Sequence, residues 1–333
     1  MPADTSAAQS PIATPPRTAA AISVTPAEGA LGAFIACGDL RRADTAILDA
    51  VRQASLDHLV VVVRGQTLAD GDLVKFGRHF GEYDITSQGP ESPLVAMGKA
   101  VQGGKFADFP EITVVSNVVE NGVALGGLGD GELTWHTDRS SHRAPPAESM
   151  LVALEVPPAG GQTAFCNMYR ALDTLPPDLR RRIEGLKLKH DSTTDSAGKV
   201  RAKLIQYEGA SVRDVPGGIH PLVCTHPDTK CDYLYLGRRP KSYLMDLDVA
   251  ESEALLDALW EHATQPAFTW QHEWQVGDLV IWDNRCTLHR REAFDPNTRR
   301  IMHRVIITGA EPFRAPGERP PHPRGASHTA QVN

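Results

Sequence analysis

The chain has 333 residues, of which 41% are hydrophobic and 23% charged, a composition that allows a buried core and excludes a wholly disordered chain. Its formal net charge of −7 provides no basic surface for a phosphate backbone, so no nucleic-acid partner is expected. Five cysteines, an odd number without a CxxC pair, indicate neither a disulfide framework nor a zinc ribbon, and we expect reduced thiols.

Both ends of the chain lack the hydrophobic periodicity of helices and strands. Residues 1–20 and 313–333 are rich in Pro, Gly and Ala, which predicts disordered tails on either side of one domain over residues 21–312. The first residues lack the basic start and apolar segment of a signal peptide, and no apolar run approaches the roughly 20 residues that cross a bilayer. We therefore expect a cytoplasmic protein without a membrane partner.

The first half of the predicted domain alternates helices and strands. Apolar residues at near-helical spacing predict helices over residues 44–56 and 69–81, and β-branched runs predict strands over 58–65 and 111–119. Five glycines lie within residues 122–131, a stretch too flexible for the interior of an element and suited to a loop beside a ligand.

The second half turns to strands. Residues 187–235 are polar and loop-rich, with one expected strand near their end. The elements predicted here are strands over 149–156, 232–236, 268–275, 277–283 and 300–309, and helices over 175–186 and 249–265. Consecutive strands with short polar breaks are typical of an antiparallel barrel or a jelly roll. The sequence therefore predicts a mainly β domain with flanking helices.

The tripeptide His136-Thr137-Asp138 directly follows the glycine-rich loop. In an extended backbone, residues i and i+2 project from the same face, so the imidazole and the carboxylate can reach one metal ion. An HxD tripeptide also occurs often by chance, and two surface polar residues are the alternative. The motif becomes informative only with a third ligand.

A candidate third ligand, His289, follows the apolar strand predicted over 277–283. Farther along, Arg300 and Arg304 are four residues apart, which places both on one face of the last predicted strand. Two imidazoles and one carboxylate leave three adjacent positions of an octahedral ion open, which suits oxygen chemistry at non-haem Fe(II). A bidentate 2-oxoacid can occupy two of these positions and O₂ the third, while an arginine holds the distal carboxylate of the acid.

These motifs resemble the taurine dioxygenase and 2,4-dichlorophenoxyacetate dioxygenase family of Fe(II)/2-oxoglutarate-dependent oxygenases. The resemblance covers residues 25–312 and rests on WHTD at 135–138, APP at 144–146, GGQT at 160–163, HPLVCTHP at 220–227 and the stretch from WDNR to MHR at 282–304. It implies a double-stranded β-helix, the jelly-roll fold of the cupins. It also implies a dioxygenase that takes Fe(II), 2-oxoglutarate and O₂.

The family's residue roles carry over by position. The resemblance implies that His136, Asp138 and His289 bind the iron and form the catalytic centre. It also implies that Arg300 pairs with the distal carboxylate of 2-oxoglutarate and that Thr163 donates a hydrogen bond to the same carboxylate.

The resemblance also bears on the substrate. Arg304 matches the arginine that binds the acidic group in the family's sulfonate and aryloxyalkanoate enzymes, which implies a small acid-bearing substrate. A second contact to 2-oxoglutarate and a salt bridge to a neighbouring acid are the alternatives. Taurine-cleaving members have a histidine soon after the turn that matches residues 80–82, and this chain has none there. Taurine is therefore not the expected substrate, and Glu132 and Asp84 are candidate contacts for an amine-bearing one.

Two other classes of function stay open on the sequence alone. The same three ligands could serve a zinc hydrolase, which would have no use for Arg300. A metal-binding β-barrel protein that has lost turnover is the second class, and an intact triad argues against it. Asp138 disfavours halogenation, since related halogenases leave the carboxylate position empty for chloride. The substrate, the choice between hydroxylation, cleavage and desaturation, and assembly into a homo-oligomer are not fixed by the sequence.

Overall fold

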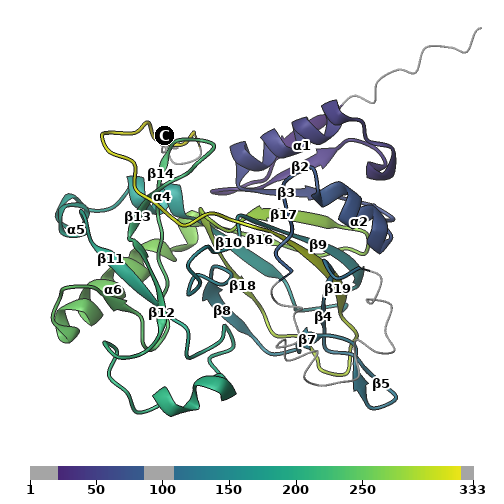
Figure 1. The fold of residues 1–333 in the computed structure, drawn as a ribbon. Helices are drawn as coiled ribbons and strands as arrows, with labels where there is room; N and C mark the ends of the chain where they lie inside the picture. The colour runs from purple at the N-terminus through teal and green to yellow at the C-terminus, as the bar shows by residue number, and fades with distance from the viewer. Residues whose placement is uncertain (1–21, 86–108, 324–333) are drawn as a thin grey trace, which may run out of the picture.

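The computed structural model describes residues 22–85 and 109–323, and two β-sheets face each other at its centre (Figure 1). The large sheet has eight strands in the order β1 (Ser23–Pro26), β2 (Ala33–Ala36), β3 (Val60–Val63), β17 (Leu279–Asp283), β9 (Glu148–Glu155), β19 (Ile301–Ile307), β4 (Thr113–Ser116) and β7 (Gly127–Leu128). The small sheet has four, in the order β16 (Thr269–His272), β10 (Thr163–Asn167), β18 (Thr287–Arg291) and β8 (Leu133–His136). This arrangement confirms the predicted mainly β jelly roll.

The apolar run of β3 is explained by burial on both faces of the large sheet. Val60 and Val62 pack in a core between the two sheets, where they join Phe165 and Leu288 of the small sheet. The alternate valines, Val61 and Val63, belong to a second core under the helices α1 (Thr45–His58) and α2 (Asp70–Gly77). A strand that is covered on both faces is apolar throughout, so periodicity of two is absent from its sequence.

Most of the predicted elements lie where the sequence places them. The helix expected over 44–56 is α1, and the helix expected over 69–81 is α2, which ends four residues early. The remaining predicted helices are α5 (Pro177–Arg182) and α6 (Val249–Ala263). The strand predicted over 111–119 is divided into β4 and β5 (Val119–Glu120), which pairs with β6 (Val123–Ala124).

The segment 187–235 differs from its prediction, because it holds four strands where one was expected. They are β11 (Lys187–Asp191), β12 (Gly217–Pro221), β13 (Val223–Thr225) and β14 (Asp232–Leu234), and β15 (Tyr243–Leu244) completes a sheet with β11 and β12. Lys189, His190 and Asp191 are buried polar residues, so β11 carries no hydrophobic alternation. The helix α4 (Met168–Asp173) and the 3₁₀ turns η1 (Leu40–Arg42), η3 (Ala202–Tyr207) and η4 (Pro266–Phe268) were not predicted either.

Residues 313–323, which the sequence assigned to a disordered tail, pack against the body of the protein. The carbonyl of Phe313 accepts a hydrogen bond from the Thr225 amide (2.8 Å). His322 is 2% exposed, stacks on Tyr169 with ring centroids 4.3 Å apart and hydrogen-bonds the carbonyl of Leu56 (3.0 Å). Stacking and single hydrogen bonds leave no periodic signal, so the composition of this segment could not indicate these contacts. The tail predictions for residues 1–20 and 324–333 lie outside the described residues.

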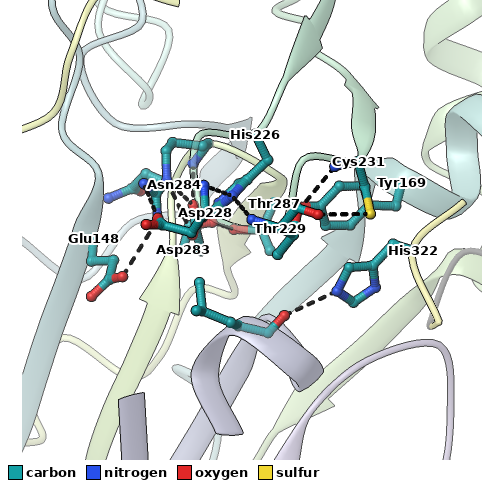
Figure 2. Close-up of polar contacts among 12 residues, drawn as sticks. Glu148, Tyr169, His226, Asp228, Thr229, Cys231, Asp283, Asn284, Thr287 and His322 are labelled. Carbon is teal, nitrogen blue, oxygen red and sulfur yellow. Dashed lines mark hydrogen bonds and ion pairs between the residues drawn. The ribbon is translucent and has the colours of Figure 1, made fainter. Parts of the chain in front are cut away.

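A buried ionic network closes the turn after β17 (Figure 2). Arg285 contacts the carboxylates of Asp283 (2.5 Å), Asp228 (3.0 Å) and Glu148 (3.4 Å). Asp283 also lies 2.9 Å from Nε2 of His226, and Arg285 and the His226 imidazole hold the pKa of Asp283 well below its usual range despite burial. One guanidinium is thus surrounded by three acids, and the turn that begins the WDNR segment is fixed.

Among the described helices, none has the length and apolar composition needed to cross a bilayer.

Glu148 is the member of this network whose pKa is raised, and its titration gives a testable prediction. Burial and the neighbouring Asp283 raise the pKa of Glu148 to about 8 from its ordinary 4.5, although Arg285 opposes the shift. Between these two values the unfolded chain ionises while the folded protein keeps its proton. The free energy of unfolding should therefore fall as pH rises through this window, by up to about 1.4 kcal/mol per pH unit.

Glu148→Gln removes this titration, so the variant should gain stability over the wild type from pH 5 to pH 8. Urea denaturation at each pH unit measures the difference. Glu261→Gln, on the exposed face of α6, is the control and should show no such trend. A Glu148→Gln difference that stays constant with pH would contradict the assigned shift.

Candidate metal centre

The side chains of His136, Asp138 and His289 come together at the β8 edge of the small sheet. His136 and His289 face each other in the register of the two strands, with ring centroids 4.2 Å apart. Oδ1 of Asp138 lies 3.8 Å from Nε2 of His136 and 3.9 Å from Nε2 of His289. The three ligand atoms all lie within 4.8 Å of one another, a spacing that one ion can bridge.

A β-bulge makes this convergence possible. His289 pairs with His136, and Arg291 pairs with Leu133, so two residues of β8 oppose the single residue Arg290 of β18. Because of the extra residue, Leu133 and His136 are both buried although they are three positions apart. Strict alternation would have turned one of them outward.

The hydrogen bonds of the ligands leave their metal-facing atoms available. Nδ1 of His136 lies 2.6 Å from the carbonyl of Thr134, so Nδ1 carries the hydrogen and Nε2 has a free lone pair. On Asp138, Oδ2 accepts from Ser149 (3.3 Å) and approaches Arg304 (3.5 Å), while Oδ1 faces the imidazoles. The donor set and its orientation fit Fe(II).

The charges of the three ligands suit a metal ion. Burial lowers the pKa of His289 to about 3, and the neighbouring His136 adds to the shift. Burial lowers the pKa of His136 as well. Burial alone would raise the pKa of Asp138, but Arg304 and the two imidazoles outweigh it and hold that pKa well below its usual range. Neutral imidazoles and an ionised carboxylate are the forms that bind a metal.

Asn284 supports the triad from the large sheet. Its side-chain amide donates to Ser149 (2.8 Å), which in turn donates to Asp138, and its carbonyl accepts from the Thr137 hydroxyl (2.6 Å). The indole of Trp282 donates to Oδ1 of Asn284 (2.9 Å). Asn284 therefore holds Thr137 through its backbone carbonyl and Asp138 through its side chain and Ser149. Sequence reasoning treated Asn284 as a turn residue and did not identify Ser149.

A cavity beside His289 contains the predicted cosubstrate residues. Thr163, Arg300 and Arg304 line it, together with Arg291 and Trp274 and an apolar wall of Val115, Leu128, Leu133, Leu151 and Trp282. Arg300 is 2% exposed, and burial together with the nearby Arg291 lowers its pKa to about 9. The Thr163 hydroxyl accepts from the indole of Trp274 (3.0 Å), which leaves its own hydrogen to donate into the cavity.

The guanidinium of Arg300 is suited to bind the carboxylate of a ligand. Among the described residues, the guanidinium of Arg300 forms no hydrogen bond or ion pair, and its buried Nε has no partner. The carbon Cζ of Arg300 lies 5.8 Å from the centre of the Trp274 ring. A buried cation without an acid is costly, and a bound carboxylate removes that cost. The cavity therefore fits the distal carboxylate of a 2-oxoacid.

Glu132 and Asp84, the two candidate contacts for an amine, are placed elsewhere. Glu132 is exposed and does not line the cavity. Asp84 forms an ion pair with Arg139 (2.5 Å), which neutralises its charge. The structure thus brings Thr163, Arg300 and Arg304 together with the triad but not these two acids.

A second cluster of potential ligands, His226, Asp283 and Cys286, does not offer free donor atoms. Figure 2 shows His226 between Asp283 and the backbone of Asp228 and Thr229, whose amides donate to Nδ1 at 3.1 and 3.2 Å. The Nε2 hydrogen is donated to Asp283. Burial raises the pKa of Cys286 well above its usual value, so the thiol stays protonated. This cluster is structural.

The support of Asp138 gives a second prediction. Ser149→Ala removes the hydrogen bond to Oδ2, so the carboxylate loses orientation and the affinity for Fe(II) should fall by about 10-fold. Anaerobic Fe(II) titration measures it. Ser55→Ala is a matched control, because Ser55 is equally buried and its hydroxyl has no partner among the described residues. Equal affinities of the two variants would show that Ser149 does not orient the ligand.

Comparison with known proteins gives the same result as the geometry. A pentalenolactone F synthase from Streptomyces arenae is 34% identical over 87% of this chain and 97% of its own length. An alpha-ketoglutarate-dependent 2,4-dichlorophenoxyacetate dioxygenase from Cupriavidus pinatubonensis is 36% identical over 74% of this chain and 83% of its own. The crystal structure of a taurine dioxygenase from Burkholderia xenovorans matches with a TM-score of 0.68 at 29% identity, over 90% of this chain and 93% of that one.

The family model described as taurine catabolism dioxygenase TauD, TfdA family matches residues 23–306. That interval includes all strands of both sheets except the last residue of β19, as well as the triad and the cavity. The chain therefore belongs to the TauD/TfdA family of dioxygenases.

Proposed function

We propose that this dioxygenase oxidises a small organic anion, with iron held by His136, Asp138 and His289 and with 2-oxoglutarate held by Arg300 and Thr163. The observation that carries the proposal is the cluster of His136, Asp138 and His289 beside a cavity in which Arg291 and Arg300 form no ion pair among the described residues. When bound, Fe(II) and 2-oxoglutarate use O₂ to oxidise a substrate C–H bond, with one oxygen atom leaving in succinate beside CO₂ and the other in the product.

Arg300, Thr163 and Trp274 have different roles in the binding of 2-oxoglutarate. Arg300 can receive the distal carboxylate by a two-pronged contact, and Thr163 can donate a further hydrogen bond to it. Trp274 orients both groups, because its indole donates to Thr163 and its face lies under Arg300. Held in this way, the far end of 2-oxoglutarate fixes where its 2-oxoacid end meets the triad.

The charge of the cavity supports an anionic substrate. Asp138 contributes −1 and Arg291, Arg300 and Arg304 contribute +3, which gives +2 for the protein groups. Fe(II) adds two positive charges and 2-oxoglutarate two negative ones, so +2 remains. Arg304 can then bind the acidic group of the substrate, while Val115, Leu128 and Leu151 contact its apolar part.

The requirement for oxygen separates this proposal from a zinc hydrolase. With Fe(II), 2-oxoglutarate and substrate, succinate should form only when O₂ is present, and His136→Ala should lower both iron affinity and succinate formation by at least about 100-fold. His142→Ala changes an exposed histidine four residues beyond Asp138 and should alter neither. Product formation with zinc and without oxygen would refute the proposal, and iron binding without any turnover would favour a binding protein.

The role of Arg304 can be tested once a succinate-based screen of carboxylates, sulfonates and aryloxyalkanoates identifies a substrate. Arg304→Gln should raise the KM for that acid by about 10- to 100-fold, because it removes a charge-assisted hydrogen bond. The same substitution should hardly change the KM for the neutral amide of that substrate. Equal losses for the acid and the amide would assign Arg304 to the support of Asp138 instead.

A further inference from the structure

Arg291 is a cationic residue of the cavity that the family resemblance does not assign. It lies two residues after His289 on β18, so both side chains project from the same face of the strand. In the register between β10 and β18 it pairs with Thr163. Paired residues of neighbouring strands share a face, so Arg291 lies beside the hydroxyl proposed to bind 2-oxoglutarate.

The guanidinium of Arg291 is buried with two of its nitrogens unpartnered. The residue is 4% exposed, and its Nε and Nη1 have no hydrogen-bond partner. Nη2 donates to the backbone carbonyls of Leu128 (3.1 Å) and Gly131. The ring of Phe294 lies 5.4 Å from its carbon Cζ. The backbone contacts hold the side chain in place but neutralise none of its charge.

Arg291 and Arg300 line the same cavity, and neither forms an ion pair among the described residues, although the carboxylate of Asp130 partly opposes the lowering of the Arg291 pKa by burial. Two such groups repel each other, and burial weakens the screening by water. The arrangement differs from Arg285, which contacts three carboxylates. A pair of buried guanidinium groups around one cavity is complementary to an anion that both can contact.

We propose that Arg291 is a second arginine for the distal carboxylate of 2-oxoglutarate, which it binds opposite Arg300 and next to Thr163. This inference rests on the proposed use of that cavity by 2-oxoglutarate. Arg300 then contacts the carboxylate from the β19 side and Arg291 from the β18 side, so the carboxylate lies between the two sheets. The site selects a 2-oxoacid by its second acidic group.

The competing role for Arg291 is to hold the backbone at Leu128 and Gly131 through its Nη2 hydrogen bonds. The two roles differ in their dependence on the ligand. A structural role affects every 2-oxoacid equally, whereas a carboxylate contact affects only those with a distal carboxylate. 2-Oxopentanoate has the chelating 2-oxoacid group of 2-oxoglutarate but lacks the distal carboxylate, so it separates them.

The experiment compares the two acids on the Fe(II)-loaded full-length chain without oxygen, with affinity taken from the visible charge-transfer band and from calorimetry. Arg291→Gln should weaken 2-oxoglutarate by about 10- to 100-fold and leave 2-oxopentanoate within about 2-fold. Arg291→Lys should lie between, since a lysine keeps the charge but not the planar geometry.

Arg290→Gln is the matched control, because Arg290 is the adjacent arginine of β18 and lies on the opposite face, over Trp135 at 5.2 Å. It should change neither affinity. Equal weakening of both acids by Arg291→Gln, or no weakening of either, would overturn the assignment. If the wild type itself shows no 2-oxoglutarate complex with Fe(II), the proposed function fails, and this outcome is distinct from a failure of Arg291 alone.

Discussion

The hydrogen bonds of Asn284 join the two sheets at the metal centre. Asn284 follows β17 of the large sheet, contacts Ser149 of β9 through its amide and accepts from Thr137 just beyond β8 of the small sheet. All of these groups are buried, so each hydrogen bond counts for more than it would at the surface, and an unpaired member would be costly. The position of the HxD segment thus depends on Asn284, a residue that contacts none of the three candidate metal ligands directly.

Arginines in this protein occur in two contrasting environments. Arg285 contacts three carboxyl groups, of which that of Glu148 keeps its proton at neutral pH, and this network fixes a turn. Arg291 and Arg300 are as deeply buried but have no ion pair among the described residues. A folded chain tolerates unpaired buried cations at a cost in stability. The cost is concentrated in the cavity beside the triad, where a ligand can offset it.

How much the sequence could predict depended on the physical origin of each feature. The strands β3 and β17 were recognisable because burial on both faces selects unbroken apolar runs. Metal ligands were recognisable because the chemistry demands particular residue types at one ion. Alternation from His289 could also have identified Arg291, since both residues lie on one face of β18.

Other features could not be predicted because they depend on tertiary contacts. Strand β11 consists mainly of polar residues that are buried by its neighbours, so no local pattern marks it. Ser149 gains its role from the approach of Asp138 and Asn284, eleven and 135 positions away. The sequence did not indicate that Asp84 is paired, because the arginine that neutralises it, Arg139, lies 55 residues along the chain.

The bulge in β8 has a consequence for how this region can vary during evolution. Point substitutions at Thr134 or Trp135 change one side chain and leave the backbone frame intact. Loss of either residue would remove the bulge and leave Leu133 two positions before His136, so strict pairing with β18 would keep both side chains on the same face, with Leu133 still opposite Arg291. The segment between the glycine-rich loop and the triad should therefore tolerate the loss of one residue as well as substitution, because neither changes the face on which Leu133 lies.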